Sequence, residues 1–438
     1  MAAADAGPAP NPTLAPSGAA PLAARVTEVQ AGPARLLLLP TPVRDAVSFR
    51  GSVVTAPDFA AGDDLAQGLV ADLLDKGSRR RDRFAIAEAL DDRGARLSFY
   101  SDGLRLGFSG RALRDDLPDV LALLAEQLRE PALEADECEK ARVQAIAGVR
   151  RARESTGALA SGALTRRLYP PDHPNYILDP ADEEARLAAL SPEAVRAYHA
   201  EHIGSDRLTI AFAGDLEPSL VAEHVERHFS DWRAHARAGA FATEAAPLPP
   251  GREDIALPDR FNLDVRLGHA LVLRRSDPDF LPVMAAVFAL GGNFSGRLMQ
   301  TIRDQMGLTY GIGASLRGVA AEHDMHLAVS VTLSQENLVR GLEATQAEVA
   351  RFVAEGLSES VLARTRTTLV GQHVVGLATT GALAARLLVN AERGLPTAYI
   401  DTYVDEVRAL SAEGVTEALR RFVRPDAMHV VVAGTLPW

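Results

Sequence analysis

Residues 190–216, LSPEAVRAYHAEHIGSDRLTIAFAGDL, align without a gap on residues 410–436, LSAEGVTEALRRFVRPDAMHVVVAGTL. Both stretches show the same succession of a polar start, a helical spacing of apolar residues, an apolar strand-like run and a closing Ala-Gly pair. Self-similarity over a long period is the mark of a duplicated fold. We therefore expect a chain built from two halves of the same fold.

The start of each repeated stretch predicts a capped helix. Ser191 and Ser411 stand where a serine side chain accepts a hydrogen bond from the first helical turn. Glu193 and Glu413 follow in that turn, where a negative charge suits the helix dipole. The runs LTIAFAG and MHVVVAG that come next are typical of strands covered on at least one face. Each copy therefore predicts a helix followed by a buried strand.

The remaining segments run in a matching order in both halves. In the first half, strand-like ARLLLLP and DAVSFRGSVV precede helices expected at 64–75, 113–129 and 134–153, with a hairpin before the second. In the second half, a strand-like segment at 264–274 precedes helices at 279–290, 296–305, 336–355 and 358–379, with strands over 308–333. We expect two tandem homologous α+β domains, each a mostly antiparallel sheet packed against a helical layer.

Composition indicates the boundaries of these domains. Residues 1–24 are rich in Ala and Pro and lack the basic and apolar regions of a signal peptide, so we expect a flexible arm. Residues 236–254 are rich in Ala, Pro and Gly and are typical of a linker. The expected domains are then 25–235 and 255–438. The arm fits either a cytoplasmic start or the mature end of an exported protein.

Charge and composition exclude several classes of protein. The formal net charge of −12 argues against nucleic acid as a partner, because phosphate binding needs clustered Lys and Arg. The single cysteine, Cys138, excludes an intrachain disulfide and a cysteine-based zinc site, and we expect it to be a small packing residue. No run reaches the roughly 18 to 20 apolar residues of a membrane span, so we expect a soluble protein, periplasmic or cytoplasmic.

The stretch GGNFSGRLMQTIRDQMGLTYGIGAS at 291–315 carries a resemblance to a known family, with lesser support from HPNY at 173–176 and from Gly77 closing a helix. On these motifs and the two tandem halves, the chain resembles the pitrilysin/insulinase superfamily of zinc peptidases, the group that includes mitochondrial processing peptidase. The resemblance implies that the two domains form half of a clam-like chamber.

Active relatives carry an inverted zinc motif, His-x-x-Glu-His, on a helix of the first half. Counting back from Gly77, the corresponding positions here are Gly68, Ala71 and Asp72, so both imidazoles and the general base are missing. A third ligand, a Glu, is expected from the helix near 140–150, and residues 140–153 contain no carboxylate. Because a catalytic zinc needs about three protein ligands, we expect no metal site in this chain.

The resemblance assigns substrate binding to Arg303 and Tyr310, which in relatives reach into the chamber facing the zinc helix. Arg offers a rigid fork of donors to peptide carbonyls, and a phenol stays protonated and donates to a developing oxyanion. The alternative is structural: Arg303 pairs with Asp304 or Glu322, and Tyr310 only packs at the start of a strand. Asn293 and Phe294 in the Gly-Gly loop are weaker candidates for substrate contact.

Two pairs of histidines have spacings that a metal site would need. His224 and His228 lie one turn apart on a predicted helix, but no third ligand is identifiable, so we interpret them as part of a solvated face. His323 and His326 precede a predicted strand, and we expect both to be exposed. Neither pair is assigned to a site.

Together these observations predict a non-catalytic, substrate-binding subunit that is inactive alone. A homologous partner would supply zinc, water and the general base, and an unstructured peptide would bind as an added strand in the shared chamber. Three alternatives stay open: a scaffolding subunit with no part in cleavage, a homodimeric peptide-binding protein, and an independent peptidase with an unrecognised metal site.

Overall fold

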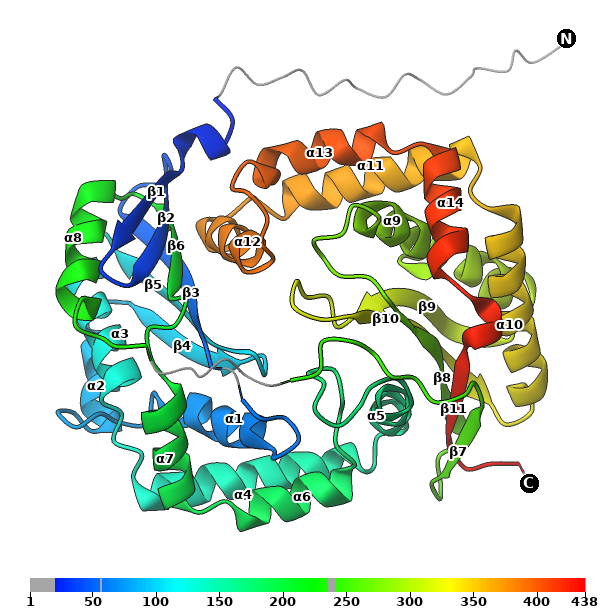
Figure 1. Cartoon of the computed structure of the whole chain (residues 1–438), viewed down its shortest axis with the longest axis horizontal. Helices are drawn as coiled ribbons and strands as arrows, with labels where there is room; N and C mark the ends of the chain where they lie inside the picture. Colours follow the sequence, from blue (N-terminus) through cyan, green and yellow to red (C-terminus); the bar gives the residue numbers. More distant parts are fainter. Residues whose placement is uncertain (1–19, 56, 235–240, 438) are drawn as a thin grey trace, which may run out of the picture.

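The strands of the computed structural model, which describes residues 20–55, 57–234 and 241–437, form two sheets, one from each half of the chain (Figure 1). The first sheet has the order β1 (Thr27–Ala31), β2 (Ala34–Pro40), β6 (Thr209–Gly214), β3 (Ala46–Val54), β5 (Arg105–Leu113), β4 (Arg96–Ser101). The second has the order β7 (Arg252–Ala256), β11 (His429–Gly434), β8 (Asn262–Leu271), β10 (Met325–Ser334), β9 (Thr309–Arg317).

Both sheets are mostly antiparallel, as the sequence predicted. The parallel pairings are β2 with β6 and β7 with β11, which occupy the same place in the two sheets. Apart from the additional β1, the strand orders β2-β6-β3-β5-β4 and β7-β11-β8-β10-β9 correspond one to one. The prediction of two homologous α+β halves is therefore confirmed.

The helices also correspond between the halves. The first half contains α1 (Asp63–Leu73), α2 (Arg83–Asp91), α3 (Leu117–Arg129), α4 (Ala135–Ala152), α5 (Thr156–Leu168), α6 (Pro180–Ala189), α7 (Pro192–His202) and α8 (Pro218–Phe229). The second contains α9 (Phe280–Gly291), the π-helix η2 (Met299–Gln305), α10 (Leu338–Glu355), α11 (Glu359–Val375), α12 (Thr380–Glu392), α13 (Tyr399–Ala409) and α14 (Ala412–Phe422). Chain order makes α1 the counterpart of α9, and α5 the counterpart of α12.

The expected arm and linker are only partly covered by the structure. Residues 1–19 of the arm and 236–240 of the linker lie outside the described residues. A short 3₁₀ helix at Ala23–Arg25 begins within the range expected as the arm. The strand β7 begins at Arg252, within the range expected as linker, and pairs with β11.

The repeated helix–strand unit folds in the same way in both copies. Ser191 Oγ accepts a hydrogen bond from the Ala194 N–H at 3.2 Å, and Ser411 Oγ accepts one from the Gly414 N–H at 3.1 Å. The closing glycines, Gly214 and Gly434, have φ of +150° and +146°. This backbone conformation favours glycine, which explains why the Ala-Gly ending recurs.

One face of each sheet packs on helices of its own half. In the first half, fully buried Phe49, Phe108 and Phe212 join a core with residues of α1, α3, α7 and α8. Cys138 lies in this core, as expected of a packing residue. In the second half, residues of β8, β10 and β11 form the equivalent core with α9, α10 and α14.

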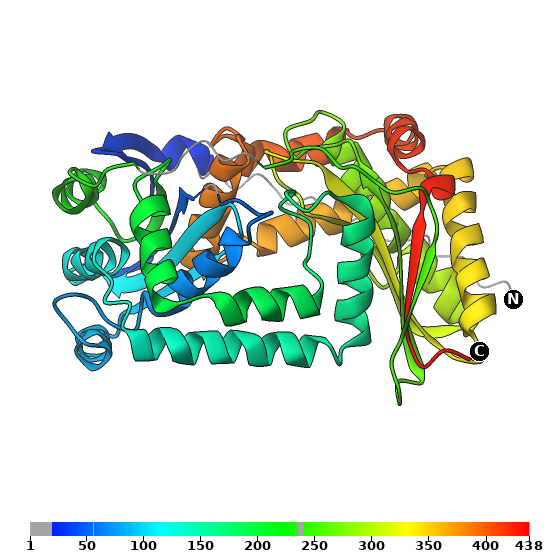
Figure 2. The same ribbon diagram turned by 60° about the horizontal axis from the view of Figure 1, so that its bottom comes forward.

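The other face of each sheet is covered by a helix from the opposite half. α12, from the second half, packs Leu387 and Leu388 on Leu37 and Leu39 of β2. α5, from the first half, packs Leu164 and neighbouring residues on β10 and β11. Figure 2 shows the chain leaving α4 and turning into α5, which stands against the second sheet. This exchange ties the halves together.

No single helix in the described ranges is both long and apolar enough to span a bilayer. The pair α11 and α12 passes this test only when counted together, and it is bent by 115° at the junction. The apolar face of α12 is packed on the first sheet, which accounts for its composition.

Candidate functional site

Helix α1 carries Gly68, Ala71 and Asp72, the three positions that the sequence predicted to correspond to the zinc motif of active relatives. Gly68 has no side chain, and a Cβ built there would meet no atom within 4 Å. Ala71 is 5% exposed and packs in the first core, whereas the Asp72 side chain is exposed. One exposed carboxylate is the only donor group that these positions present, so they do not fit a zinc ion.

Helix α4 packs against α1 and would have to provide the third ligand. Its residues on the first core are Cys138, Ala141 and partly buried Ala145, which offer no carboxylate. Among the described residues, no group of three or more His, Cys, Asp or Glu side chains is placed to hold a metal ion.

Arg303 lies on η2, a seven-residue π-helix where the sequence predicted an ordinary helix. Its wide turn is closed by the Met306 N–H donating to the Thr301 carbonyl at 3.0 Å. Segments of π-helix are rare and recur at functional sites. The Arg303 guanidinium lies 5.8 Å from the centre of the Phe294 ring, and its Nε lies 3.9 Å from Asp304 Oδ1. Because the latter distance exceeds hydrogen-bonding range, Arg303 is only loosely held.

Tyr310 follows η2 by a short turn through Gly307, whose φ is +64°. It is the second residue of β9 and is 96% exposed. A tyrosine that merely packed at the start of a strand would bury its ring, so the exposure argues against the structural alternative for Tyr310. The structural alternative for Arg303 is present in part, because Arg303 forms a long ion pair with Asp304. The other partner proposed for Arg303, Glu322, forms an ion pair with Arg105 instead.

The two candidate side chains therefore project from adjoining elements, because η2 packs against β9. Phe294, from the Gly-Gly loop, is 78% exposed and lies beside Arg303. Among the described residues, the polar and ring contacts of Arg303 are with Asp304 and Phe294, and none is with Tyr310. Tyr310 is open to solvent, whereas the Arg303 side chain is 39% exposed.

The chain matches known families and structures over much of its length. Residues 69–177 match the family model described as Insulinase (Peptidase family M16), and residues 189–369 match Peptidase M16 inactive domain. The two matches together span more than half of the chain; the first lies within the first half, and the second runs from the end of α6 in the first half into α11 in the second. The chain belongs to peptidase family M16.

Several M16 proteins are similar to this chain over most of its length. It is 24% identical over 326 residues to Uncharacterized zinc protease SCO5738 of Streptomyces coelicolor, covering 72% of this chain and 69% of the relative. Non-peptidase homolog YmxG of Helicobacter pylori is 18% identical, with 80% of each chain covered. A peptidase M16 inactive domain structure from Pseudomonas fluorescens superposes with a TM-score of 0.83 at 23% identity, covering 93% of this chain and 97% of that one. This structural likeness establishes the shared fold.

The M16 chain has one further feature near α1 that the sequence reading missed. The strand β4 packs against α1 and has β5 as its single neighbour in the described sheet. Its side chains alternate between exposed and half-buried, and Tyr100 on it is 37% exposed. The alternation in RLSFYS predicted a strand, but only the tertiary structure identifies it as the edge strand beside α1.

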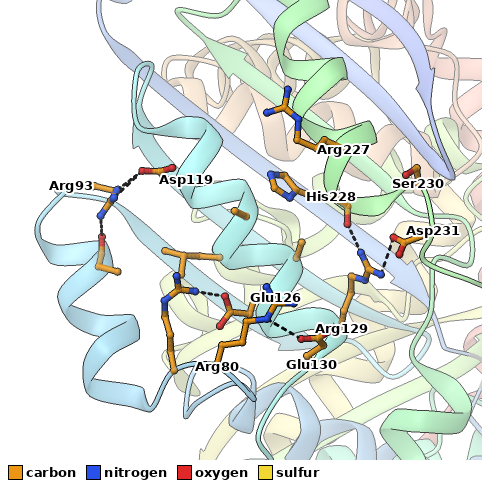
Figure 3. A pocket seen from close by; sticks show the side chains of 15 residues that line it. Arg80, Arg93, Asp119, Glu126, Arg129, Glu130, Arg227, His228, Ser230 and Asp231 are labelled. Atoms are coloured by element: carbon orange, nitrogen blue, oxygen red, sulfur yellow. Dashed lines mark hydrogen bonds and ion pairs between the residues drawn. The ribbon is translucent and has the colours of Figure 1, made fainter.

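His224 and His228 lie on α8, and His228 lines a surface groove of about 570 Å³ formed with α2 and α3 (Figure 3). Burial lowers the pKa of His228, and the positive charge of neighbouring Arg227 lowers it further. The arginines of the groove are all in ion pairs: Arg80–Glu130, Arg81–Glu126, Arg93–Asp119, Arg129–Asp231 and Arg227–Glu223. Because every arginine of the groove is ion-paired and its histidine, His228, lies beside Arg227, we interpret the groove as a structural ion-pair network that joins three helices.

The expectation that His323 and His326 are exposed is wrong. They are 4% and 6% exposed, because α5 and the loop after it cover this side of the second sheet. His326 Nδ1 lies 3.0 Å from the hydroxyl of Tyr169. His173, from the HPNY stretch, stacks on Tyr169 with ring centres 4.2 Å apart and contacts His323. The four rings form a buried cluster between the halves.

Proposed function

We propose that this M16 chain is the non-catalytic, substrate-binding subunit of a heterodimeric zinc endopeptidase, with Arg303 and Tyr310 as its contribution to the shared active site. The observation that carries the proposal is the contrast between the halves. The zinc helix has lost its ligands, while the second half holds a 96% exposed phenol and a loosely held guanidinium on adjoining elements.

The chemistry of the pair fits a role in peptide hydrolysis. The Tyr310 hydroxyl can donate to the oxyanion that develops on a peptide carbonyl, and such a donor acts without titrating. The Arg303 guanidinium can donate two parallel hydrogen bonds to substrate carbonyls and orient the peptide. The Phe294 ring supports it, since a cation placed over an aromatic face is attracted to it. Zinc, its bound water and the general base would come from the homologous partner subunit.

The edges of the two sheets supply a way to bind an extended peptide. β4 and β9 are corresponding end strands, and each has one neighbour in its described sheet. An unstructured peptide can add to such an edge through main-chain hydrogen bonds with little sequence preference. β9 also carries Tyr310, which would place a bound segment beside the pair.

The experiment that tests the proposal compares the isolated chain with a mixture containing a zinc-motif M16 homologue from the same source. The readouts are zinc content and hydrolysis of a quenched-fluorescence, unstructured peptide. We expect no zinc and no hydrolysis from this chain, and chelator-sensitive hydrolysis from the mixture that exceeds that of the homologue alone. Zinc-dependent hydrolysis by the isolated chain would contradict the proposal. An Arg303→Ala chain that supports full activity would favour the scaffolding alternative.

A further inference from the structure

A cleft with a volume of about 440 Å³ lies between α5 and the second sheet, away from the Arg303 end of β9. Its walls come from both halves: α5 and the loop at Pro174 and Asn175 on one side, and β8, β9 and β10 on the other. The volume lies within the range of small-ligand sites. Neither the zinc-motif positions nor the Arg303 and Tyr310 pair belongs to it.

The register of the second sheet determines which side chains form the floor of the cleft. Arg317, the last residue of β9, lies directly opposite His326 on β10. Ser330, four residues further along β10, lies directly opposite Arg266 on β8. Opposed residues share a face of an antiparallel sheet, so all four point toward α5. Ala328 lies between them and leaves the centre of the floor open.

The charge of this cleft is opposite to that of the chain. Two arginines line it and no carboxylate does, although the whole chain carries a formal net charge of −12. Arg266 is compensated by Asp264, with Nη1 and Oδ1 3.3 Å apart. Arg317 forms no ion pair or side-chain hydrogen bond within the described ranges, and its side chain is exposed. The cleft therefore holds one uncompensated positive charge.

His326 adds a neutral donor next to Arg317. The Tyr169 hydroxyl lies 3.0 Å from His326 Nδ1 and can donate its proton to this nitrogen. With Nδ1 accepting, the proton of the neutral ring stands on Nε2. Burial lowers the pKa of His326 to about 3, so the ring stays neutral near pH 7.

In the first half, side chains of the protein itself occupy the position that corresponds to this cleft. Arg50 on β3 pairs with Ala211 of β6, and Arg266 on β8 pairs with Val431 of β11; Ala211 and Val431 are equivalent positions of the repeat, so Arg50 corresponds to Arg266. The same register makes Gly107 on β5 the counterpart of Ala328 on β10. There, Tyr100 lies on Gly107, so that a Cβ on that glycine would be 2.2 Å from the Tyr100 ring. The carboxylate of Glu392 from α12 accepts a hydrogen bond from Ser52 on the same face. Only the second half keeps this place open and free of carboxylates.

We propose that the cleft binds the C-terminal carboxylate of a peptide whose last side chain is apolar. One uncompensated guanidinium matches one carboxylate, and the Arg317 fork together with the His326 and Ser330 donors suits its planar group. Leu164, Ile177 and Ala328 provide apolar walls for the terminal side chain. The identity of the ligand as a peptide rests on the proposed function, whereas the carboxylate preference rests on the cleft alone.

The test measures binding of N-terminally labelled, unstructured decapeptides ending in leucine to the isolated full chain by fluorescence anisotropy. One peptide has a free C-terminal carboxylate, one is amidated, and one is amidated with glutamate as its penultimate residue. We expect the free acid to bind at least about tenfold more tightly than the amide, as for a lost charge-assisted hydrogen bond. The glutamate peptide tests whether the cleft binds a side-chain carboxylate in place of the C-terminal one.

Variants then assign the preference to the cleft. Arg317→Gln should remove the advantage of the free acid, and Arg317→Lys should retain part of it. Arg340→Gln makes the same charge change on α10, against the opposite face of the sheet, and should leave binding unchanged. Equal binding of acid and amide, an Arg317→Gln chain that keeps the preference, or no binding of any peptide would overturn the inference. If only this preference fails while Arg303→Ala still lowers hydrolysis in the mixed complex, the proposed function stands without it.

Discussion

The hydroxyl of Tyr169, at the end of α5, lies 3.0 Å from Nδ1 of His326 on β10. This buried hydrogen bond joins a residue of the first half to a residue of the second. His173 stacks on the same phenol and is fully buried. The contact between the halves is thus built from rings that must stay neutral, because a buried charge without a partner is costly.

This cluster predicts a loss of stability in acid. Burial lowers the pKa of His173 and of His326 to about 3, against about 6.5 in an unfolded chain. The unfolded state therefore binds protons first, and the stabilisation is present above pH 6.5 and is lost as the pH falls toward 3. Each histidine should remove about 1.4 kcal/mol of unfolding free energy per pH unit in this window. Urea unfolding at a series of pH values measures the slope.

A substitution separates the histidines from other titrating groups. His173→Phe keeps a ring on Tyr169, loses the Asn175 N–H to Nδ1 hydrogen bond, and should lower stability at pH 8 while reducing the slope by about one proton. Burial raises the pKa of Asp102 and Glu392, whose stabilisation is present at low pH and is lost as the pH rises through those raised values. They titrate alike in the parent chain and in the His173→Phe chain, so the difference between the two slopes from pH 6.5 to 5.5 is decisive. An unchanged slope there would refute the assignment.

The repeat at 190–216 and 410–436 made the duplicated fold predictable from sequence, because a cap, a helix and a buried strand leave a local signature. Both serine caps and both strands form where the sequence predicted them. Exposure of the Arg303 and Tyr310 side chains was not predictable in the same way. It depends on η2 adopting a π-helix and on β9 lying at an edge.

The buried histidines and the exchanged helices were missed for one shared reason. α5 and α12 cover sheets of the opposite half, so the residues they bury show no local pattern that identifies their partner. His326 stands in an alternating strand and looks exposed until α5 is placed over it. Long-range packing of this kind becomes visible only in three dimensions.

The exchange predicts that a change in α12 destabilises the opposite half. Leu387 is 1% exposed and packs on β2 and β6, so Leu387→Ala should cost about 2 to 5 kcal/mol. Trp232 is buried in the first half and reports its unfolding by fluorescence, in a Trp438→Phe background. The control is Leu220→Ala, at a 54% exposed position on α8, which should have little effect. A Trp232 transition insensitive to Leu387→Ala would show that α12 does not hold the first sheet.

Gly68 offers a test of whether the packing of α1 requires a glycine at this position. It lies in the interior of α1, where a Cβ would meet no atom, so Gly68→Ala should raise stability by about 0.4 to 1 kcal/mol. The comparison is Gly214→Ala, where φ is +150° and a Cβ would lie 2.2 Å from the Ala46 carbonyl oxygen. That variant should be strongly destabilised. Thermal unfolding distinguishes the two, and a destabilised Gly68→Ala would mean that the glycine is retained for packing.

The sharpest test of the proposed active site is the removal of one oxygen. Tyr310→Phe should lower kcat of the mixed complex by about 10² to 10³-fold and change KM little, because an oxyanion donor acts in the transition state and not in peptide binding. The side chain is 96% exposed, so the unfolding temperature of the variant should match that of the parent chain. Arg303→Ala should instead raise KM as well, since the guanidinium orients the bound peptide. The control is Arg340→Ala, which removes an exposed arginine on α10 and should alter neither kcat nor KM. A Tyr310→Phe chain with full kcat would leave the phenol without a role in hydrolysis and would shift the weight to the scaffolding alternative.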